Sequence, residues 1–407
     1  MTLQSDTATT PIIDADTHVI ETRDLWTSRL PRKWQADAPH VETHPNSGLR
    51  RWKMADEWMC GESHYAAAGW KDYSPSCPPS LEQADPATWQ PAARLKRMDE
   101  YGIQAQLLYP NILGFYTTAF IGHPDHDFAI ACVRAYNDFL TEEFHQLAPD
   151  RFIPITALPF WDIDASIAEL KRCANLGHRG IVLANRYEKA GLPSFVDERW
   201  HPLYAVAQDM DISINFHVGF QSANPNAEMG ATELSLVRET QQQLRDDRTN
   251  REARAAYVRY TIPPLMANSD TITALLTSDL CIRFPKLNFV SVESGFGYVP
   301  YLLEAIDWQW STLGARAAFS ERLLPSEYFM RQCYGTFWFE KTTMPLLEAF
   351  ADNFMFATDF PHPLSVSPGP ASPADMPNIH VAKAFADVPD EVARKVVYSN
   401  AARLYKL

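Results

Sequence analysis

The feature that most constrains the fold is a series of eight short apolar runs separated by stretches of helical periodicity. The runs cover residues 12–15, 105–109, 152–158, 180–183, 212–216, 287–292, 336–339 and 354–357. Near-continuous apolar runs of this length are typical of buried parallel strands. Helices are predicted over 92–101, 127–146, 164–174 and 200–210. The alternation predicts an α/β protein, specifically a (β/α)₈ TIM-like barrel.

Two long segments, at about 27–90 and 221–261, interrupt this alternation. They follow the first and fifth predicted strands, so we expect both insertions at the C-terminal mouth of one barrel domain spanning 1–407. Connections of this length in a compact domain are usually functional or disordered. The first insertion is rich in aromatic residues, which favours an apolar or aromatic small-molecule substrate.

Composition limits the kinds of binding partner and the cellular compartment that we expect for this protein. The net charge of −14 argues against nucleic acid or an anionic membrane as a partner. No apolar run is long enough to span a bilayer. The polar N-terminus does not resemble a signal peptide, and the six cysteines form no C-x-x-C pair, so a cytoplasmic protein is expected. A homodimer is the default expectation for its assembly.

The segment Ile12-Ile13-Asp14-Ala15-Asp16-Thr17-His18 carries the first chemical signal. Side chains alternate along a strand, so Asp16 and His18 project to the same side at its C-terminal end. A carboxylate and an imidazole placed in this way are able to share one divalent metal. The alternative is a strand followed by an ordinary turn, with His18 on the surface.

Other strand ends carry matching residues. Because strand ends converge on one face of a barrel, Asp16, His18, His217, Asp359 and Glu293 are predicted as metal ligands. Converging buried carboxylates need a cation to be tolerated. The structural alternatives are a helix-capping role for Glu293 and a turn at Asp359.

Further polar residues lie close to these strand ends. His362 follows Asp359 by three residues, so Glu293, Asp359 and His362 are predicted as catalytic proton-transfer residues. The amide side chains near the second, fourth and fifth strand ends are predicted to bind substrate, namely Asn111, Asn185 and Asn215.

The order Asp16-Thr17-His18, Asn215-Phe216-His217 and Asp359-Phe360-Pro361-His362 resembles the amidohydrolase superfamily. The branch is the one that includes aminocarboxymuconate semialdehyde decarboxylase and aromatic-acid decarboxylases. The resemblance runs from about Ile12 to the C-terminus and includes Arg97-Met98-Asp99-Glu100-Tyr101-Gly102-Ile103 and Asn175-Leu176-Gly177-His178-Arg179-Gly180. It implies a TIM-like barrel with a divalent metal, commonly zinc or manganese.

The same resemblance implies that His18, His217 and Asp359 are metal ligands. Asp16 stands where the more usual H-x-H pair has its first histidine. Glu293-Ser294-Gly295 stands where the decarboxylases have a histidine followed by glycine to handle a proton. A glutamate there is able to act as a general base or to bind metal.

Three functions remain open. The leading hypothesis is a hydrolase in which a metal-activated water attacks a small apolar or aromatic substrate, with Asp359, Glu293 or His362 taking the proton. The second is a metal-dependent non-oxidative decarboxylase of an aromatic or unsaturated acid. The third is a dinuclear non-haem iron monooxygenase, because the ligand set is rich in carboxylates.

Overall fold

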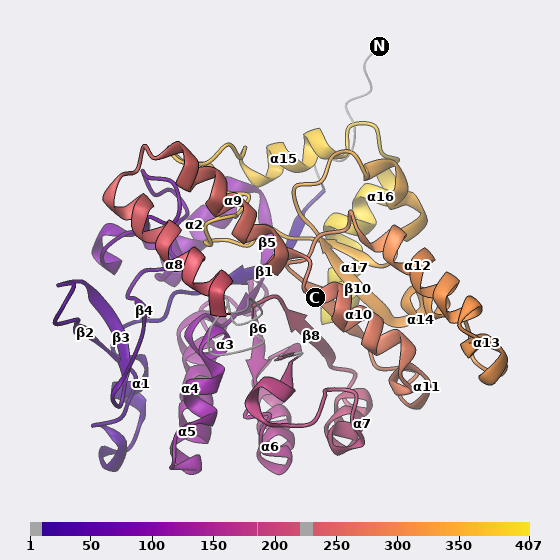
Figure 1. Ribbon diagram of the computed structural model, residues 1–407, viewed down its shortest axis with the longest axis horizontal. Coiled ribbons are helices and arrows are strands. Elements are labelled where there is room, and N and C mark those ends of the chain that lie inside the picture. Colours follow the sequence, from indigo (N-terminus) through magenta and orange to yellow (C-terminus); the bar gives the residue numbers. More distant parts are fainter. Residues whose placement is uncertain (1–9, 185, 220–230) are drawn as a thin grey trace.

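The computed structural model describes residues 10–184, 186–219 and 231–407. Its centre is an eight-stranded parallel sheet with the neighbour order β1-β5-β6-β7-β8-β9-β10-β11 (Figure 1). Each strand pairs with the next strand of the barrel, which confirms the predicted (β/α)₈ architecture. The strands are β1 (Ile12–His18), β5 (Ile103–Tyr109), β6 (Phe152–Ala157), β7 (Gly180–Leu183), β8 (Ser213–His217), β9 (Phe289–Val292), β10 (Cys333–Phe337) and β11 (Phe354–Phe356).

The segment after β11 closes the ring against β1. Thr17 and Phe360 form a parallel bridge, and the His18 amide donates a hydrogen bond of 2.7 Å to the Phe360 carbonyl. The Asp359 amide donates to the Asp16 carbonyl at 2.9 Å. These bonds bring the two ends of the barrel sequence together, so that residues 359–362 lie beside the end of β1.

Helices surround the sheet (Figure 1). No helix in the described part of the chain is long and apolar enough to cross a membrane. The helices are α1 (Leu25–Arg29), α2 (Pro91–Tyr101), α3 (Ile112–Phe115), α4 (Thr117–Ile121), α5 (His126–Phe139), α6 (Ile163–Asn175), α7 (His201–Asp209), α8 (Ala231–Asp246), α9 (Arg251–Leu265), α10 (Asn268–Thr277), α11 (Leu280–Arg283), α12 (Val299–Thr312), α13 (Ala315–Ala318), α14 (Pro325–Gln332), α15 (Pro377–Ala384), α16 (Asp390–Arg394) and α17 (Asn400–Tyr405).

Strand alternation divides the core into two clusters. Alternate residues such as Ile153 and Ile155 pack in one cluster with Tyr405 of α17. The residues at the intervening positions of the strands, such as Ile181 and Ile214, pack in the other cluster, with residues of the surrounding helices. A register shift between Asp14 and Thr17 interrupts this alternation in β1. Such bulges re-aim side chains, and this one lies at the residues predicted to bind metal.

The insertion at 27–90 is not a structureless loop. It contains an antiparallel sheet of β2 (His40–Thr43), β3 (Arg50–Met54) and β4 (Glu57–Gly61). Trp52 of β3 is buried and packs edge-on against Trp26 of α1, with ring centroids 5.4 Å apart. The alternation of buried Trp52 and Met54 with the more exposed Arg51 and Lys53 explains why this charged segment forms a strand.

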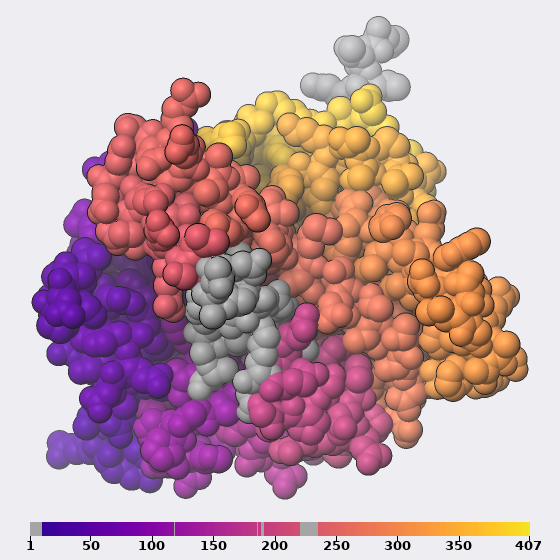
Figure 2. Space-filling model, in the orientation of Figure 1, coloured from indigo at the N-terminus to yellow at the C-terminus, as the bar shows by residue number. Residues whose placement is uncertain are grey.

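The insertion at 221–261 contributes α8 and α9, and α9 reaches the first insertion. The Ser74 and Tyr257 hydroxyl oxygens lie 3.1 Å apart, and Arg254 donates to the Ser74 carbonyl at 2.6 Å. Arg248 also pairs with Asp72. Figure 2 shows the salmon surface of the second insertion against the indigo surface of the first. The two insertions therefore form one continuous cover.

A buried arginine contacts two neighbouring strands and the segment that closes the barrel. Arg94 of α2 donates to the His18 carbonyl at 2.6 Å and to Gln106 Oε1 at 2.8 Å. Its guanidinium carbon lies 4.7 Å from the centroid of the Phe360 ring. Burial lowers the pKa of Arg94 to about 9, so the group remains charged at neutral pH. One cation thus contacts β1, β5 and the closing segment.

We expect Arg94→Met to lower the free energy of unfolding by about 3 kcal/mol, because each hydrogen bond from a buried charged group contributes substantially. Lys96→Met on the exposed face of the same helix is the matched control and should change stability little. Urea unfolding followed by circular dichroism measures both variants. Equal midpoints for the two variants would contradict the role given to Arg94.

Candidate metal centre

Three side chains from opposite sides of the barrel meet at its mouth. His18 Nε2 lies 3.0 Å from His217 Nε2. Asp16 Oδ1 is 3.6 Å from the first of these nitrogens and 3.4 Å from the second. All three residues are buried. The predicted pairing of Asp16 with His18 at the end of β1, and of both with His217 at the end of β8, is therefore present.

The hydrogen bonds of the two imidazoles determine which nitrogen carries the proton. His18 Nδ1 lies 3.2 Å from the Pro110 carbonyl oxygen, and His217 Nδ1 lies 2.7 Å from the Val218 carbonyl oxygen. A carbonyl only accepts, so each Nδ1 carries the hydrogen and each Nε2 of a neutral ring presents a lone pair. Two lone pairs 3.0 Å apart repel each other unless a proton or a cation lies between them.

A second group of donors adjoins the first. Asp359 Oδ1 is 3.6 Å from His18 Nε2 and 3.0 Å from His362 Nδ1. The His362 Nε2–H donates to Asn111 Oδ1 at 2.7 Å, so His362 Nδ1 also presents a lone pair to a carboxylate. The His18 and His362 rings stack with centroids 3.8 Å apart. Burial, together with the charges of neighbouring histidines, lowers the pKa of both rings.

The carboxylates at this centre are buried without compensation. Neither oxygen of Asp16 or Asp359 has a hydrogen-bond partner among the described residues. Burial, and then the neighbouring charges of Glu293 and Asp16, raises the pKa of Asp359 well above its usual value. Burial opposes a charged His217, yet the nearby Asp16 raises its pKa. After burial, the next cause of each shift is a neighbouring negative charge, which a cation would neutralise.

Glu293 flanks this centre. It follows β9, and its Oε2 lies 3.6 Å from His217 Nδ1, on the side of the ring turned away from His18. It belongs to neither of the two groups of described residues whose donor atoms converge within 4.8 Å, which are Asp16 with His18 and His217, and His18 with Asp359 and His362. Burial is the largest cause of the shift and raises the pKa of Glu293 to about 8. The charge of His217, the next cause, opposes this rise.

Both acidic residues at the ends of β9 and β11 have left-handed backbones. Glu293 has φ = 58° and Asp359 has φ = 59°. This conformation costs a non-glycine residue on the order of 1 kcal/mol and is concentrated at functional sites. Each strand end thus turns sharply where its carboxylate is presented.

The donor set fits a divalent metal. Ligands about 2.1 Å from one ion lie roughly 3.0–3.5 Å from one another. The separations among Asp16 Oδ1, Asp359 Oδ1 and the two Nε2 atoms that are given above are close to this range. Both histidines donate their other N–H to a backbone carbonyl, which is the usual arrangement for metal-ligating imidazoles.

The three asparagines predicted to bind substrate have different outcomes. Asn111 Nδ2 donates to the Val19 carbonyl at 2.8 Å while its Oδ1 holds His362, so it orients a neighbour of the centre. Asn215 Oδ1 accepts from Tyr109 and Tyr405, and its Nδ2 donates to the Ile181 carbonyl at 2.9 Å. Those bonds occupy Asn215 within the barrel. Asn185 lies outside the described residues.

Two buried acids near the centre escaped sequence reasoning. Glu21 accepts from the Asn111 and Ile112 amides at 3.0 and 2.8 Å, and burial raises its pKa to about 7. Asp14 accepts from the Thr358 amide at 2.8 Å, and burial raises its pKa to about 7 as well. Asp14 is an acidic residue within the apolar start of β1, and this pattern could have identified it from the sequence. Glu21 follows the strand without any such signal.

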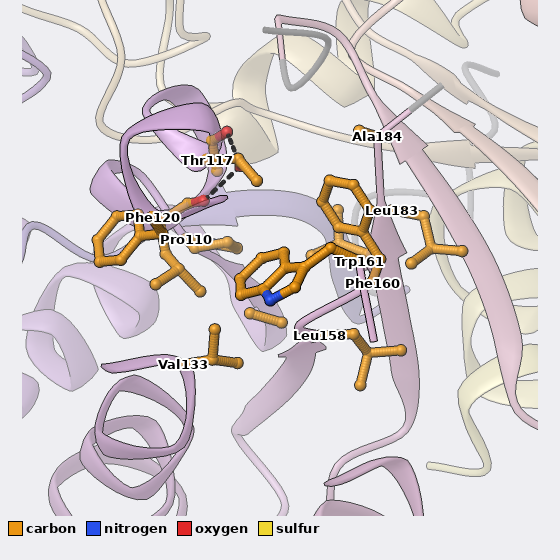
Figure 3. A pocket seen from close by; sticks show the side chains of 13 residues that line it. Pro110, Thr117, Phe120, Val133, Leu158, Phe160, Trp161, Leu183 and Ala184 are labelled. Atoms are coloured by element: carbon orange, nitrogen blue, oxygen red, sulfur yellow. Dashed lines mark hydrogen bonds between the residues drawn. The ribbon is translucent and has the colours of Figure 1, made fainter. Parts of the chain in front are cut away.

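Aromatic and aliphatic side chains surround the polar cluster. Tyr65 of the first insertion stacks on Phe115 of α3 with centroids 4.9 Å apart, and its centroid lies 5.2 Å from that of His362. A small apolar pocket lies beyond, after β5, β6 and β7, with Pro110, Phe120, Phe160 and Trp161 in its wall (Figure 3). The centre is thus enclosed by low-dielectric material, which strengthens electrostatic interactions within it.

We expect His217→Ala to abolish binding of manganese or zinc while leaving the fold intact, because it removes one of the two converging Nε2 donors. Elemental analysis after dialysis gives the metal content, and circular dichroism checks the fold. His126→Ala, at an exposed position, is the control and should retain metal. Full metal retention by His217→Ala would contradict the site.

We also expect a pH-dependent effect of Glu293 in metal-free protein. Its pKa of about 8 in the folded state exceeds the usual 4.5, so the folded state holds a proton that the unfolded state loses. The stability from this proton is complete below about pH 4.5 and is lost as pH rises through about 8.

Between about pH 5 and pH 8.5, the wild type should therefore lose on the order of 2 kcal/mol more unfolding free energy than Glu293→Gln. Urea unfolding of both proteins at the two pH values measures the difference. Parallel losses in the two proteins would show that Glu293 titrates normally.

Two comparisons place this chain among known proteins. Gamma-resorcylate decarboxylase from Rhizobium sp. (strain MTP-10005) is 28% identical over 277 residues, which are 66% of this chain and 76% of the relative. An amidohydrolase structure from Mycobacterium avium subsp. paratuberculosis K-10 matches with a TM-score of 0.72 at 18% identity, covering 97% of this chain and 99% of that one.

A third comparison involves a structure with metal. Dihydroxybenzoic acid decarboxylase from Polaromonas sp. JS666, solved with bound manganese and the inhibitor 2-nitroresorcinol, matches with a TM-score of 0.61 at 18% identity. The match covers 98% of this chain and 97% of that one. The amidohydrolase family model matches residues 13–407, which include every residue of the centre described above. This protein is therefore an enzyme of the amidohydrolase family.

Proposed function

We propose that the protein is a metal-dependent non-oxidative decarboxylase of a hydroxylated aromatic acid. The observation that carries this proposal is the convergence of Asp16, His18 and His217 on one position, next to a second position at which His18 meets Asp359 and His362. Relatives named as decarboxylases of dihydroxybenzoates support the reaction class. The hydrolase reading, which led from sequence, is less well supported than its decarboxylase alternative.

One ion fits better than two. The two groups of donors share His18, so they describe overlapping positions. We propose that Asp16, His18, His217 and Asp359 hold a single ion, with manganese favoured because a structural relative contains it. The dinuclear iron alternative gains no support from these overlapping groups. When bound by these residues, the ion would supply Lewis-acid chemistry for a substrate carboxylate and its neighbouring hydroxyl group.

Glu293 is the proposed proton donor. In the metal-free protein, burial raises the pKa of Glu293, which favours the protonated carboxyl group that a proton donor requires. In the reaction, the Glu293 proton passes to the ring carbon that carries the carboxylate. The bond from that carbon to the carboxyl carbon then breaks, its electron pair restores the aromatic ring, and carbon dioxide leaves. A proton from solvent restores Glu293.

His362 and Asn111 complete the proposal as positioning residues. Asn111 holds His362 by the 2.7 Å hydrogen bond described above, and His362 directs Nδ1 at Asp359. The stacked ring of His362 also covers one face of His18 and keeps water away from it. These contacts keep the donor atoms in place through side chains that are themselves fully buried.

We expect manganese-loaded protein to release carbon dioxide from 2,6-dihydroxybenzoate or a related 2-hydroxybenzoate, and not to hydrolyse phenyl esters or lactones. Glu293→Gln should lower kcat at least about 100-fold, as expected when a general acid is removed, while retaining metal. Headspace carbon dioxide and elemental analysis give both readouts. Ester hydrolysis without carbon dioxide release would overturn the proposal and restore the hydrolase reading.

A further inference from the structure

The donor residues of the metal centre are covered. Asp16, His18, His217 and Asp359 are each at most 1% exposed. An ion held by these residues would therefore be out of reach of an aromatic acid in this conformation. A side chain over the donors has to move before a substrate of that size binds.

The ring of Phe115 lies against the imidazoles of the centre. Phe115 is the last residue of α3 and is 6% exposed. Its ring centroid lies 6.1 Å from that of His18, 6.0 Å from that of His217 and 5.7 Å from that of His362. A benzene ring thus already adjoins the two imidazoles whose Nε2 atoms converge.

A second aromatic ring stacks on the first. The ring of Tyr65, from the first insertion, lies at 22° to that of Phe115, with centroids 4.9 Å apart. The Tyr65 centroid also lies 5.2 Å from that of His362. Stacking of this kind is a favoured arrangement for two aromatic rings. Tyr65 therefore helps to hold a flat ring against the histidines.

The loop after β8 leaves room for this ring. Gly219 follows His217 by two residues, and a Cβ at Gly219 would lie 2.6 Å from Cε1 of Phe115. Its φ of 82° also disfavours any other residue. A flat ring fits between α3 and the loop after β8 because position 219 has no side chain.

The turn that carries Phe115 is short and has unfilled space beside it. α3 has four residues, and the Phe115 amide donates to the Asn111 carbonyl at 2.8 Å. Leu113 and Gly114 line the apolar pocket of Figure 3, which has a volume of about 20 Å³. Close packing is what normally fixes a buried side chain. The gap beside α3 leaves this turn freer to shift than a fully packed helix.

We propose that the ring of Phe115 occupies the place of the substrate ring in the free enzyme, and that Tyr65 stacks on the substrate ring once Phe115 has moved away. This inference rests on the proposed function, in which the substrate is a hydroxylated aromatic acid. The carboxylate and hydroxyl group of such an acid stand on neighbouring ring carbons, so its ring lies next to the donors. Phe115 is then an internal competitor of the substrate, and Tyr65 determines specificity for ligands with a ring.

Two acids separate the effect of the ring from that of the polar groups. 2-Hydroxybenzoate and glycolate both carry a carboxylate and a nearby hydroxyl group, but only 2-hydroxybenzoate has a ring. Calorimetry on manganese-loaded protein gives both dissociation constants, after elemental analysis has shown equal metal content in each variant. Phe115→Ala should lower the dissociation constant of 2-hydroxybenzoate at least about fivefold, because the competing ring is gone, and leave that of glycolate unchanged. Phe115→Leu, which keeps an apolar side chain on α3, should also lower it.

Benzene tests whether the vacated place is the one that the substrate ring takes. The cavity left by Phe115→Ala should admit benzene, as apolar cavities of that size do. Saturating benzene should then raise the dissociation constant of 2-hydroxybenzoate at least about fivefold in Phe115→Ala, but not in the wild type, where Phe115 fills the place. Phe120→Ala, at a buried phenylalanine of α4, is the matched control and should show no such competition.

Tyr65 is tested with the same two acids. Tyr65→Leu should weaken binding of 2-hydroxybenzoate about fivefold and leave glycolate unchanged, whereas Tyr65→Phe keeps the ring and should retain the wild-type affinity. Equal losses for the two acids in Tyr65→Leu would refute the stacking role.

Weaker binding of 2-hydroxybenzoate by Phe115→Ala and Phe115→Leu would overturn the proposal, because Phe115 would then be a fixed wall that contacts the substrate. Unchanged binding in both variants, or competition of benzene with both acids, would overturn it as well. If the affinities change as expected but no carbon dioxide is released from the acid, the proposed function fails while the exchange of rings stands.

Discussion

The constraint on which this site depends is the approach of two imidazole lone pairs. Backbone carbonyls lie beside the outer nitrogens of His18 and His217, so the inner nitrogens meet 3.0 Å apart, where a proton or a cation is needed between them. The carboxylates of Asp16 and Asp359, which have no hydrogen-bond partner among the described residues, both adjoin His18. A fold maintains such an arrangement only when binding of a cation compensates for it.

The barrel bears the cost of this arrangement at several points. The bulge in β1 re-aims Asp16, and the left-handed turns at Glu293 and Asp359 present their carboxylates at a conformational cost. Hydrogen bonds between β1 and the segment after β11 hold the ring closed, with Arg94 packed behind them. Strain at the mouth is thus supported by well-bonded structure directly beneath it, as is usual for functional sites.

The predictable part of this protein is the part governed by periodicity. Apolar runs gave the eight strands, and the rule that strand ends converge was enough to expect Asp16, His18 and His217 near one another, with Asp359 beside His18. The position of Glu21 was not predictable, because its role depends on amides of a loop ninety residues away. The hydrogen-bond partners of Asn215 were not predictable for a related reason. Its place at a strand end suggested the pocket, but two tyrosines from distant segments use its amide inside the barrel.

The joint between the two insertions has a consequence of its own. Asp72 and Ser74 meet Arg248, Arg254 and Tyr257 across the mouth through polar contacts, while the donors for the ion lie on the strands. The insertions and the donor residues therefore belong to different parts of the chain. Substitutions in the insertions can change which molecules reach the site while the donor residues on the strands stay the same. Enzymes with the same donor residues can therefore differ in substrate and keep the same chemistry.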